Sequence, residues 1–478
     1  MIFNSFDFAI FLPIVFFLYW FVTKNNLKLQ NLLIVAASYV FYGWWDYRFL
    51  SLIAFSSIVD YSIGIALNNT EKKSSRKILL ITSLCTNLGL LGFFKYYNFF
   101  VSNFESAFSF FGYKFEGYTL DIILPVGISF YTFQTLSYTI DVYRKNLNPT
   151  KDFIAFSAFV SFFPQLVAGP IERASNLLPQ FFKKRNFNYN FAVDGTRQIL
   201  WGLFKKVVIA DQCAIYVNTI FDNSEHYGGV VLILGALLFA FQIYGDFSGY
   251  SDIAIGISKL FGFNLMQNFA FPYFSRDIAE FWRRWHISLS TWFRDYLYIP
   301  LGGSRGSLGK KIRNTFIIFL VSGFWHGANW TFIVWGGLNA LYFLPLLLTK
   351  KNRHNLDTVA ENRLLPTPKE LLQLLTTFSI TLIAWIFFRA ENIGHAFSYL
   401  KNIFSSNSSM NFEMEYSIFI LLLFFLVIEW LGRTKLYAIA SVEQTLKSKS
   451  IRWVFYLVLC FTIIGYMDNQ QDFIYFQF

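Results

Sequence analysis

The stretch that decides the fold runs from Arg313 to Lys350 and reads RNTFIIFLVSGFWHGANWTFIVWGGLNALYFLPLLLTK. Its two ends are basic, and the chain must enter a membrane and return if both ends lie in the cytoplasm. The inbound arm, 314–325, makes roughly 18 Å of helix at 1.5 Å per residue, whereas the hydrocarbon core is about 30 Å thick. We therefore predict either a short hairpin whose turn, 323–329, lies inside the bilayer, or two close-packed full spans that use flanking sequence. In both cases His326 lies deep.

The composition places this hairpin in a membrane protein. The chain has 478 residues, of which 55% are hydrophobic, 21% aromatic and 14% charged. Soluble domains carry about 25% charged residues, and a soluble globule this poor in charge would expose large apolar patches. The numbers exclude a disordered chain, an ordinary cytosolic enzyme and a nucleic-acid partner.

The predicted fold class is all-α: one polytopic integral membrane domain over 1–478, with roughly 11–12 inserted segments around a central tunnel. Some segments are too short or interrupted for simple spans. The run 153–170 contains Pro164, Gly169 and Pro170, and we expect a re-entrant element there, which is tolerated only inside protein.

Charge distribution predicts the orientation. Lys plus Arg is 40 and Asp plus Glu is 29, so the formal charge is 40 − 29 = +11. Basic residues concentrate in cytoplasmic loops. Placing the basic loops inside leaves both termini extracytoplasmic.

The longest polar stretch, 275–313, is predicted to be a cytoplasmic amphipathic helix followed by a basic loop. Aromatic and aliphatic side chains recur there at spacings of three and four, as on one face of a helix: Trp282, Trp285, Leu289, Trp292 and Tyr296. Such a helix suits a membrane interface, and a peripheral anchor without chemistry explains the periodicity equally well.

Among the histidines, His326 is the strongest candidate for chemistry. Ionisable groups at membrane depth are costly and mark functional paths, and a neutral imidazole can take a proton from a hydroxyl near pH 7. Asn329, three residues on, could orient the ring or polarise a carbonyl. His286 is a second candidate, beside Arg283 and Ser290. The alternative for both is a structural histidine. His226, His354 and His395 suit solvated surface.

Other polar side chains interrupt apolar runs, and the stretch 244–252, YGDFSGYSD, could break a helix within the membrane. These residues line a tunnel or serve as hydrogen-bond partners, and we favour structural packing for most of them: Gln134, Asp141, Gln165, Asp211, Gln242, Asp246 and Asp252. The three cysteines and five histidines form no metal-ligand spacing, so no metal site is predicted.

Three motifs together resemble a known family. They read FWRRWHISLSTW at 281–292, DYLYIPLGG at 295–303 and GFWHGANW at 323–330, with support from 124–134, 163–171, 202–206 and 473–478. The sequence is similar to the membrane-bound O-acyltransferases, and within them to the bacterial alginate O-acetyltransferase branch.

The resemblance implies a multi-pass enzyme of the bacterial cytoplasmic membrane that transfers an acetyl or other acyl group to hydroxyls. It implies a cytoplasmic thioester donor, usually acetyl-CoA, and no bound cofactor. The acceptor would be an extracytoplasmic polysaccharide or a partner acetyltransferase with a serine nucleophile. The roles implied are general base for His326, second histidine for His286 and oxyanion donor for Asn329, with donor contacts at Arg283, Arg284, Trp285 and Ser290.

Two alternatives stay open at this point. One is a D-alanyl transferase of the teichoic acid type, which takes its acyl group from a carrier-protein thioester. The other is a transporter of an anionic or lipid-linked solute, although no internal repeat is visible and His326 would then have no task.

Overall fold

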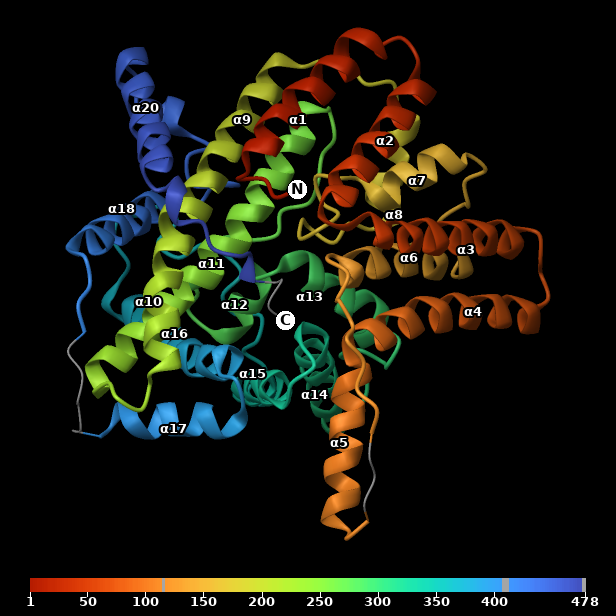
Figure 1. Ribbon diagram of the computed structural model, residues 1–478. Coiled ribbons are helices and arrows are strands. Elements are labelled where there is room, and N and C mark those ends of the chain that lie inside the picture. Colours follow the sequence, from red (N-terminus) through yellow and green to blue (C-terminus); the bar gives the residue numbers. More distant parts are fainter. Residues whose placement is uncertain (114–116, 406–411, 475–478) are drawn as a thin grey trace. The chain divides into compact units, whose positions relative to one another are not determined.

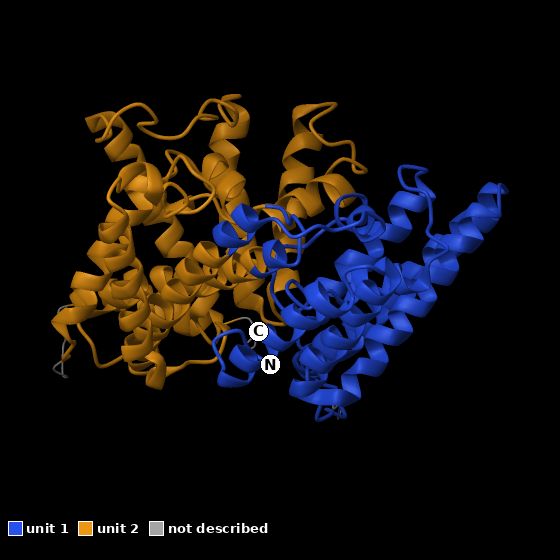
Figure 2. Ribbon diagram, turned by 90° about the horizontal axis from the view of Figure 1, so that it is seen from above, with its two compact units in different colours: residues 1–195, 257–266 blue, residues 196–256, 267–478 orange. Residues whose placement is uncertain are grey.

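The computed structural model describes residues 1–113, 117–405 and 412–474 (Figure 1), and every regular element in those ranges is a helix. The end of the terminal motif, 475–478, lies outside them. The described chain divides into two compact units, 1–195 with 257–266, and 196–256 with 267–478 (Figure 2). The prediction of a single membrane-embedded domain stays a prediction.

Among the described residues of the first unit, eight α-helices lie entirely within it. They are α1 (Phe6–Phe17), α2 (Leu27–Asp46), α3 (Leu50–Asn68), α4 (Lys73–Leu91), α5 (Tyr97–Phe110), α6 (Ile128–Tyr143), α7 (Phe153–Ser161) and α8 (Ala174–Leu177). Helix α9 (Tyr189–Leu203) carries the chain into the second unit.

The second unit holds the candidate site and most of α11. Its helices are α10 (Asp211–Asp222), α11 (Gly229–Leu260, ending in the first unit), α12 (Ile278–Arg284), α13 (Ile287–Phe293), α14 (Leu308–His326), α15 (Trp330–Leu348), α16 (Pro368–Arg389), α17 (Ile393–Ile403), α18 (Tyr416–Gly432), α19 (Val442–Thr445) and α20 (Lys449–Gly465).

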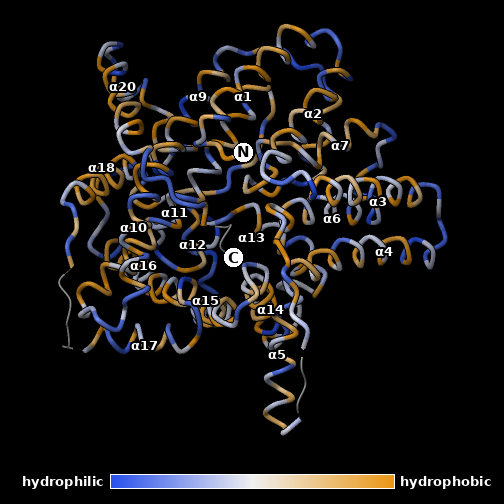
Figure 3. The backbone as a smooth tube through the Cα atoms, in the orientation of Figure 1, coloured by the Kyte–Doolittle hydropathy of each residue, from blue (hydrophilic) through white to orange (hydrophobic). Residues whose placement is uncertain are grey.

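The helices have the length and surface of membrane spans. In the described chain, five helical stretches are long and apolar enough to cross a bilayer: 27–68, 73–110, 229–260, 330–348 and 368–389. Apolar residues run along them (Figure 3), and many point outward: Ile78 and Leu372 are 64% and 66% exposed. Lipid covers such side chains, whereas water does not tolerate large patches of them. The polytopic all-α prediction is confirmed; the number of inserted segments and the tunnel stay predictions.

The core of the first unit is polar where α3, α4 and α6 pack together. The buried Asp60 carboxylate accepts hydrogen bonds from Asn87 Nδ2 at 2.7 Å, Thr139 Oγ1 at 2.8 Å and the Ser83 hydroxyl. Buried polar groups are stable only when they are hydrogen-bonded. This network therefore pins three apolar helices in one register.

The run 153–170 forms a short helix and then an irregular segment. Helix α7 ends at Ser161, and the chain from Ala155 to Ile171 is buried throughout. Enclosure in protein is what an interrupted element at membrane depth requires, so the burial agrees with the predicted re-entrant element.

The stretch 275–313 differs from the prediction. The predicted single helix is α12, α13 and a π-helical turn, Arg294–Tyr298, with a break at His286, whose φ is 42°. The apolar stripe is core: Trp285 and Leu289 are 1% and 2% exposed. The predicted helix is therefore interrupted at His286, and protein covers part of its apolar stripe, because spacing identifies an apolar face but not what covers it. Its interfacial placement stays a prediction. The cytoplasmic location stays a prediction.

Helix α14 also differs, since it is longer than the predicted inbound arm. It begins at Leu308 and takes in Lys310, Lys311 and Arg313, which gives 19 residues and about 28 Å of length. Helix α15 has 19 residues too, and the two lie side by side (Figure 1). Of the two predicted arrangements, the structure favours the close-packed pair of full-length helices, because long basic side chains extend from a helix end toward water.

Candidate active site

Two glycines set the contact between α14 and α15. A Cβ added to Gly323 would collide with the carbonyl oxygen of Phe332, and one added to Gly336 would collide with that of Phe319. The helices therefore meet backbone against backbone, as small residues allow in membrane proteins. The contact fixes the end of α14 three residues beyond Gly323.

His326 occupies that end. It is the last residue of α14 and is 3% exposed. Three aromatic rings surround the imidazole, with centroids at 4.9 Å for Trp325, 5.1 Å for Trp335 of α15 and 5.3 Å for Phe388 of α16. The structure confirms that the ring is buried, and it shows that packing between three helices fixes its position.

His286 sits at the break between α12 and α13 and is 1% exposed. Its Nδ1 lies 3.1 Å from the side-chain oxygen of Asn268, which also accepts the backbone N–H of Ser288 at 3.2 Å. A backbone N–H only donates, so that atom of Asn268 is the oxygen and His286 Nδ1 carries the proton. Nε2 is then a hydrogen-bond acceptor, and in the described chain it has no hydrogen-bond partner.

The two imidazoles share one neighbour. The Trp325 ring lies 6.0 Å from the His286 ring and 4.9 Å from the His326 ring, so the structure brings the two predicted histidines to one indole. Phe247 of α11 stacks edge-on against His286 at 4.6 Å. Burial lowers the pKa of His286 to about 3, because desolvation disfavours the imidazolium. The ring is therefore neutral at ordinary pH.

Asn329 caps α15. Its side-chain oxygen accepts the backbone N–H of Thr331 at 3.0 Å, and its amide nitrogen donates to the carbonyl of Glu391 at 2.8 Å. The amide nitrogen carries two hydrogens, so the capping role is compatible with a second bond from it, and the oxyanion role stays a prediction.

The four predicted donor-binding residues separate in the structure. Arg283 is exposed and donates to the carbonyls of Asn352, at 2.9 Å, and Asn355, at 2.5 Å. Arg284 pairs with Glu280 at 2.9 Å. Trp285 is core, and the Ser290 hydroxyl donates to its carbonyl at 3.4 Å. Of the four, Arg283 alone is exposed.

The sequence analysis named three buried carboxylates of the second unit, Asp211, Asp246 and Asp252, but missed the two lysines that pair with them. Lys205 Nζ lies 2.5 Å from Asp252, and Lys206 Nζ lies 2.8 Å from both Asp211 and Asp246. The sequence did contain a signal for these pairs, because two lysines lie inside one apolar run and Asp246 and Asp252 lie inside another. A buried charge is stable only when it is paired, so the buried lysines and the buried carboxylates needed each other as partners.

Helix α11 is continuous through 244–252, so the possible helix break is wrong. A Cβ at Gly245 would lie 2.9 Å from the Lys205 carbonyl oxygen, and one at Gly249 would lie 2.8 Å from that of Gly202. The glycines admit a neighbouring backbone instead of ending the helix. This supports the interpretation of Asp246 and Asp252 as structural partners.

In the described residues, no group of three or more His, Cys, Asp and Glu side chains could hold a metal ion.

Known proteins resemble this chain over most of its length. The probable alginate O-acetylase AlgI of Azotobacter vinelandii is 40% identical over 407 residues, which cover 85% of this chain and 78% of that protein. The chain belongs to the membrane-bound O-acyltransferase family. The model of the membrane-bound O-acyltransferase family matches residues 149–384, a range that contains both buried histidines.

Two further proteins match as well. The peptidoglycan O-acetyltransferase of Helicobacter pylori is 38% identical over 438 residues, or 85% of this chain and 80% of that protein. The teichoic acid D-alanyltransferase of Streptococcus thermophilus is 30% identical over 290 residues, or 56% of this chain and 69% of that protein. The chain is thus a multi-pass membrane O-acyltransferase.

Proposed function

We propose that this enzyme transfers an acetyl group from a cytoplasmic thioester, acetyl-CoA or another acyl thioester, across the membrane. The acceptor is a hydroxyl of an extracytoplasmic polysaccharide or the serine of a partner acetyltransferase. One relative is named as a probable alginate O-acetylase and another as a peptidoglycan O-acetyltransferase, which supports a polysaccharide acceptor. The observation that carries the proposal is the pair of buried imidazoles against Trp325.

His326 is the general base in this proposal. It removes the proton of the acceptor hydroxyl as the oxygen attacks the thioester carbonyl. The tetrahedral intermediate then collapses, the carbon–sulfur bond breaks, and the thiolate takes the proton from the imidazolium. The aromatic walls from Trp325, Trp335 and Phe388 exclude water from the thioester.

His286 is the second polar group of the site. Its protonated Nδ1 is held by Asn268, so Nε2 presents a lone pair. A neutral acceptor of this kind orients a hydroxyl or thiol by accepting its hydrogen bond. In this proposal His286 is a positioning group, and His326 is the base.

The proposal also states which membrane holds the enzyme and which way its termini face. The enzyme lies in the bacterial cytoplasmic membrane with both termini outside, because the basic loops then face the cytoplasm. Cysteine labelling near Lys310 checks this orientation: reagent added from outside should not react there.

The experiment uses the purified full-length protein with radiolabelled acetyl-CoA and a polysaccharide acceptor, alginate or peptidoglycan, and measures release of free CoA. We expect turnover by wild type and by the control His354→Ala, whose side chain is exposed. His326→Ala should release no CoA while keeping the wild-type melting temperature. Full activity of a folded His326→Ala variant would remove the base assignment.

The second candidate is D-alanyl transfer, which the Streptococcus thermophilus relative supports. A D-alanyl carrier-protein thioester offered to the same preparation separates the two. We expect no D-alanyl transfer, and transfer of D-alanine without acetyl would replace the proposal.

A further inference from the structure

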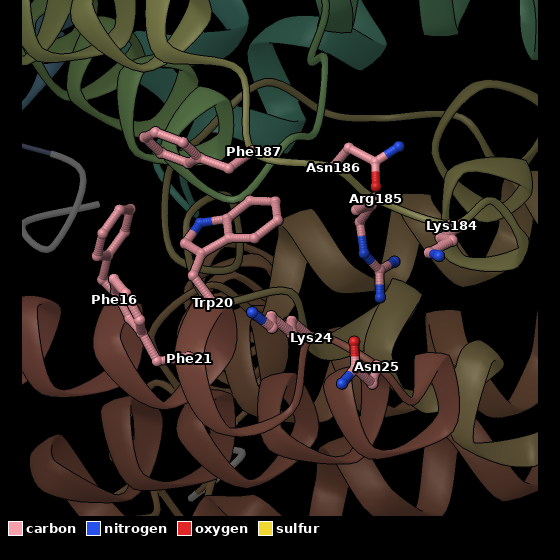
Figure 4. Close-up of a pocket in the computed structure, with 9 residues that line it drawn as sticks. All are labelled: Phe16, Trp20, Phe21, Lys24, Asn25, Lys184, Arg185, Asn186 and Phe187. Atoms are coloured by element: carbon pink, nitrogen blue, oxygen red, sulfur yellow. The ribbon is translucent and has the colours of Figure 1, made fainter.

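A cavity of about 330 Å³ opens in the first unit, at the end of the first apolar helix. One wall comes from α1 and the π-helical turn after it, Leu18–Val22, and the other from the segment 184–187. In Figure 4 the Arg185 guanidinium reaches toward the space beside Lys24 and Asn25, and Trp20 and Phe187 border the other side. The cavity has one cationic and one aromatic half.

The cationic half has no counter-ion among the residues that the structure describes, since no carboxylate there forms an ion pair with Lys24, Lys184 or Arg185. Arg185 is only 6% exposed, and its terminal nitrogens donate to neutral oxygens, to Asn31 at 2.6 Å and to the carbonyl of Gln180 at 3.4 Å.

The Nε of Arg185 is buried and has no hydrogen-bond partner in the described chain. A buried guanidinium is costly without an anion, so a ligand that brings negative charge is favoured here. The planar N–H groups of Arg suit phosphate in particular.

Hydrogen bonding and ring packing hold the side chains of the aromatic half in place. Trp20 donates its indole N–H to the carbonyl of Leu260 at 2.9 Å and packs edge-on against Phe187 at 5.5 Å. Phe16 meets Phe187 at 6.0 Å. The wall continues onto a bare apolar surface, where Phe21 and Val22 are 63% and 64% exposed. Such a surface suits hydrocarbon rather than a soluble anion.

The geometry points to a binding site for the phosphate headgroup of an acidic phospholipid, with its acyl chain along Phe21 and Val22. Basic pockets beside membrane helices bind anionic headgroups by this combination of charge and apolar wall. The cavity's volume lies at the lower end of the range for small-ligand sites, roughly 300–1,000 Å³. Free phosphate shares the headgroup chemistry but leaves the aromatic wall unused.

The test uses the full-length protein in detergent, titrated with phosphatidylglycerol or phosphatidylcholine in mixed micelles. Native mass spectrometry counts retained lipid, and the melting temperature reports stabilisation. We expect wild type to retain phosphatidylglycerol at least about tenfold more tightly than phosphatidylcholine. The double variant Lys24→Gln/Lys184→Gln should lose this preference, and its exposed positions should leave folding intact.

A matched control removes the same charge elsewhere. Lys28 and Lys183 are exposed and do not line the cavity, so Lys28→Gln/Lys183→Gln should keep the preference. Equal retention of both lipids by wild type, or equal loss in both double variants, would overturn the site. Competition by inorganic phosphate or coenzyme A at concentrations equal to the lipid would assign the cavity to a soluble phosphate instead. The readout is lipid binding, so it is independent of acyl transfer.

Discussion

The two histidines of the site are equally buried, yet they are held by different means. His326 ends a regular helix and is surrounded by aromatic rings from three helices. His286 lies in a left-handed turn, and one amide, that of Asn268, orients its ring. Packing therefore positions the first imidazole and a hydrogen bond positions the second. Changes to helix contacts should affect His326, whereas changes to polar partners should affect His286.

The largest expected effect distinguishes the general base, His326, from the positioning group, His286. His326→Gln should lower kcat by about 10³-fold, within the range that general acid–base catalysis contributes. His286→Gln should cost about tenfold, because glutamine still accepts a hydrogen bond. Acetyl-CoA turnover by the two purified variants measures this, with His354→Gln as the control. Equal losses would make the histidines one functional unit.

The second prediction tests whether the contact between α14 and α15 positions His326. Gly323→Ala places a methyl group against the Phe332 carbonyl, so α14 and α15 must separate and His326 must move. Overpacking costs about 1–3 kcal/mol, and we expect about 10²-fold loss of activity. Gly337→Ala is the matched control, since its Cβ meets only Leu320 Cδ2 at 3.8 Å. Unchanged turnover in Gly323→Ala would separate the helix contact from catalysis.

Asn268→Ala tests positioning by the hydrogen bond. It removes the acceptor for His286 Nδ1, so the ring can rotate or change tautomer, and activity should fall about tenfold. The double variant Asn268→Ala/His286→Gln should be no worse than either single variant. Additive losses would show that Asn268 acts on the site by another route.

The pKa of His286 predicts a pH dependence of stability. The unfolded imidazole binds a proton below pH 6.5 and the folded one only near pH 3, so the unfolded state holds more protons between these values. The free energy of unfolding should therefore fall as pH drops, by about 2 kcal/mol from pH 6.5 to 5 for this one group. Thermal unfolding of wild type and His286→Gln measures it, and identical pH slopes would contradict the prediction.

The smallest effect concerns Asn329. Loss of the cap should cost about 1 kcal/mol of stability, and Asn329→Ala should keep activity within a few-fold. Removal of an oxyanion donor costs about 10²–10³ in kcat. Turnover of a folded Asn329→Ala variant therefore distinguishes a capping role from an oxyanion role, and a large loss of activity would support the oxyanion role.

The burial of His326 was predictable because its signal is local: the histidine interrupts a long apolar run. The missed contacts join separate segments: Lys206 meets Asp246 forty residues on, and Asn268 meets His286 eighteen residues on. Periodicity identified the apolar face around Trp285 but not the other segments of the chain that bury this face.

Hydropathy and charge act residue by residue, so the order of residues was sufficient to identify a multi-pass helical membrane protein with a buried imidazole in a helical hairpin. Three features became visible only in the folded chain: α14 is full-length, Asn329 caps a helix, and His286 points a lone pair away from Asn268. Those outcomes depend on which distant side chain offers a better partner than lipid or water does, and no local pattern records that competition.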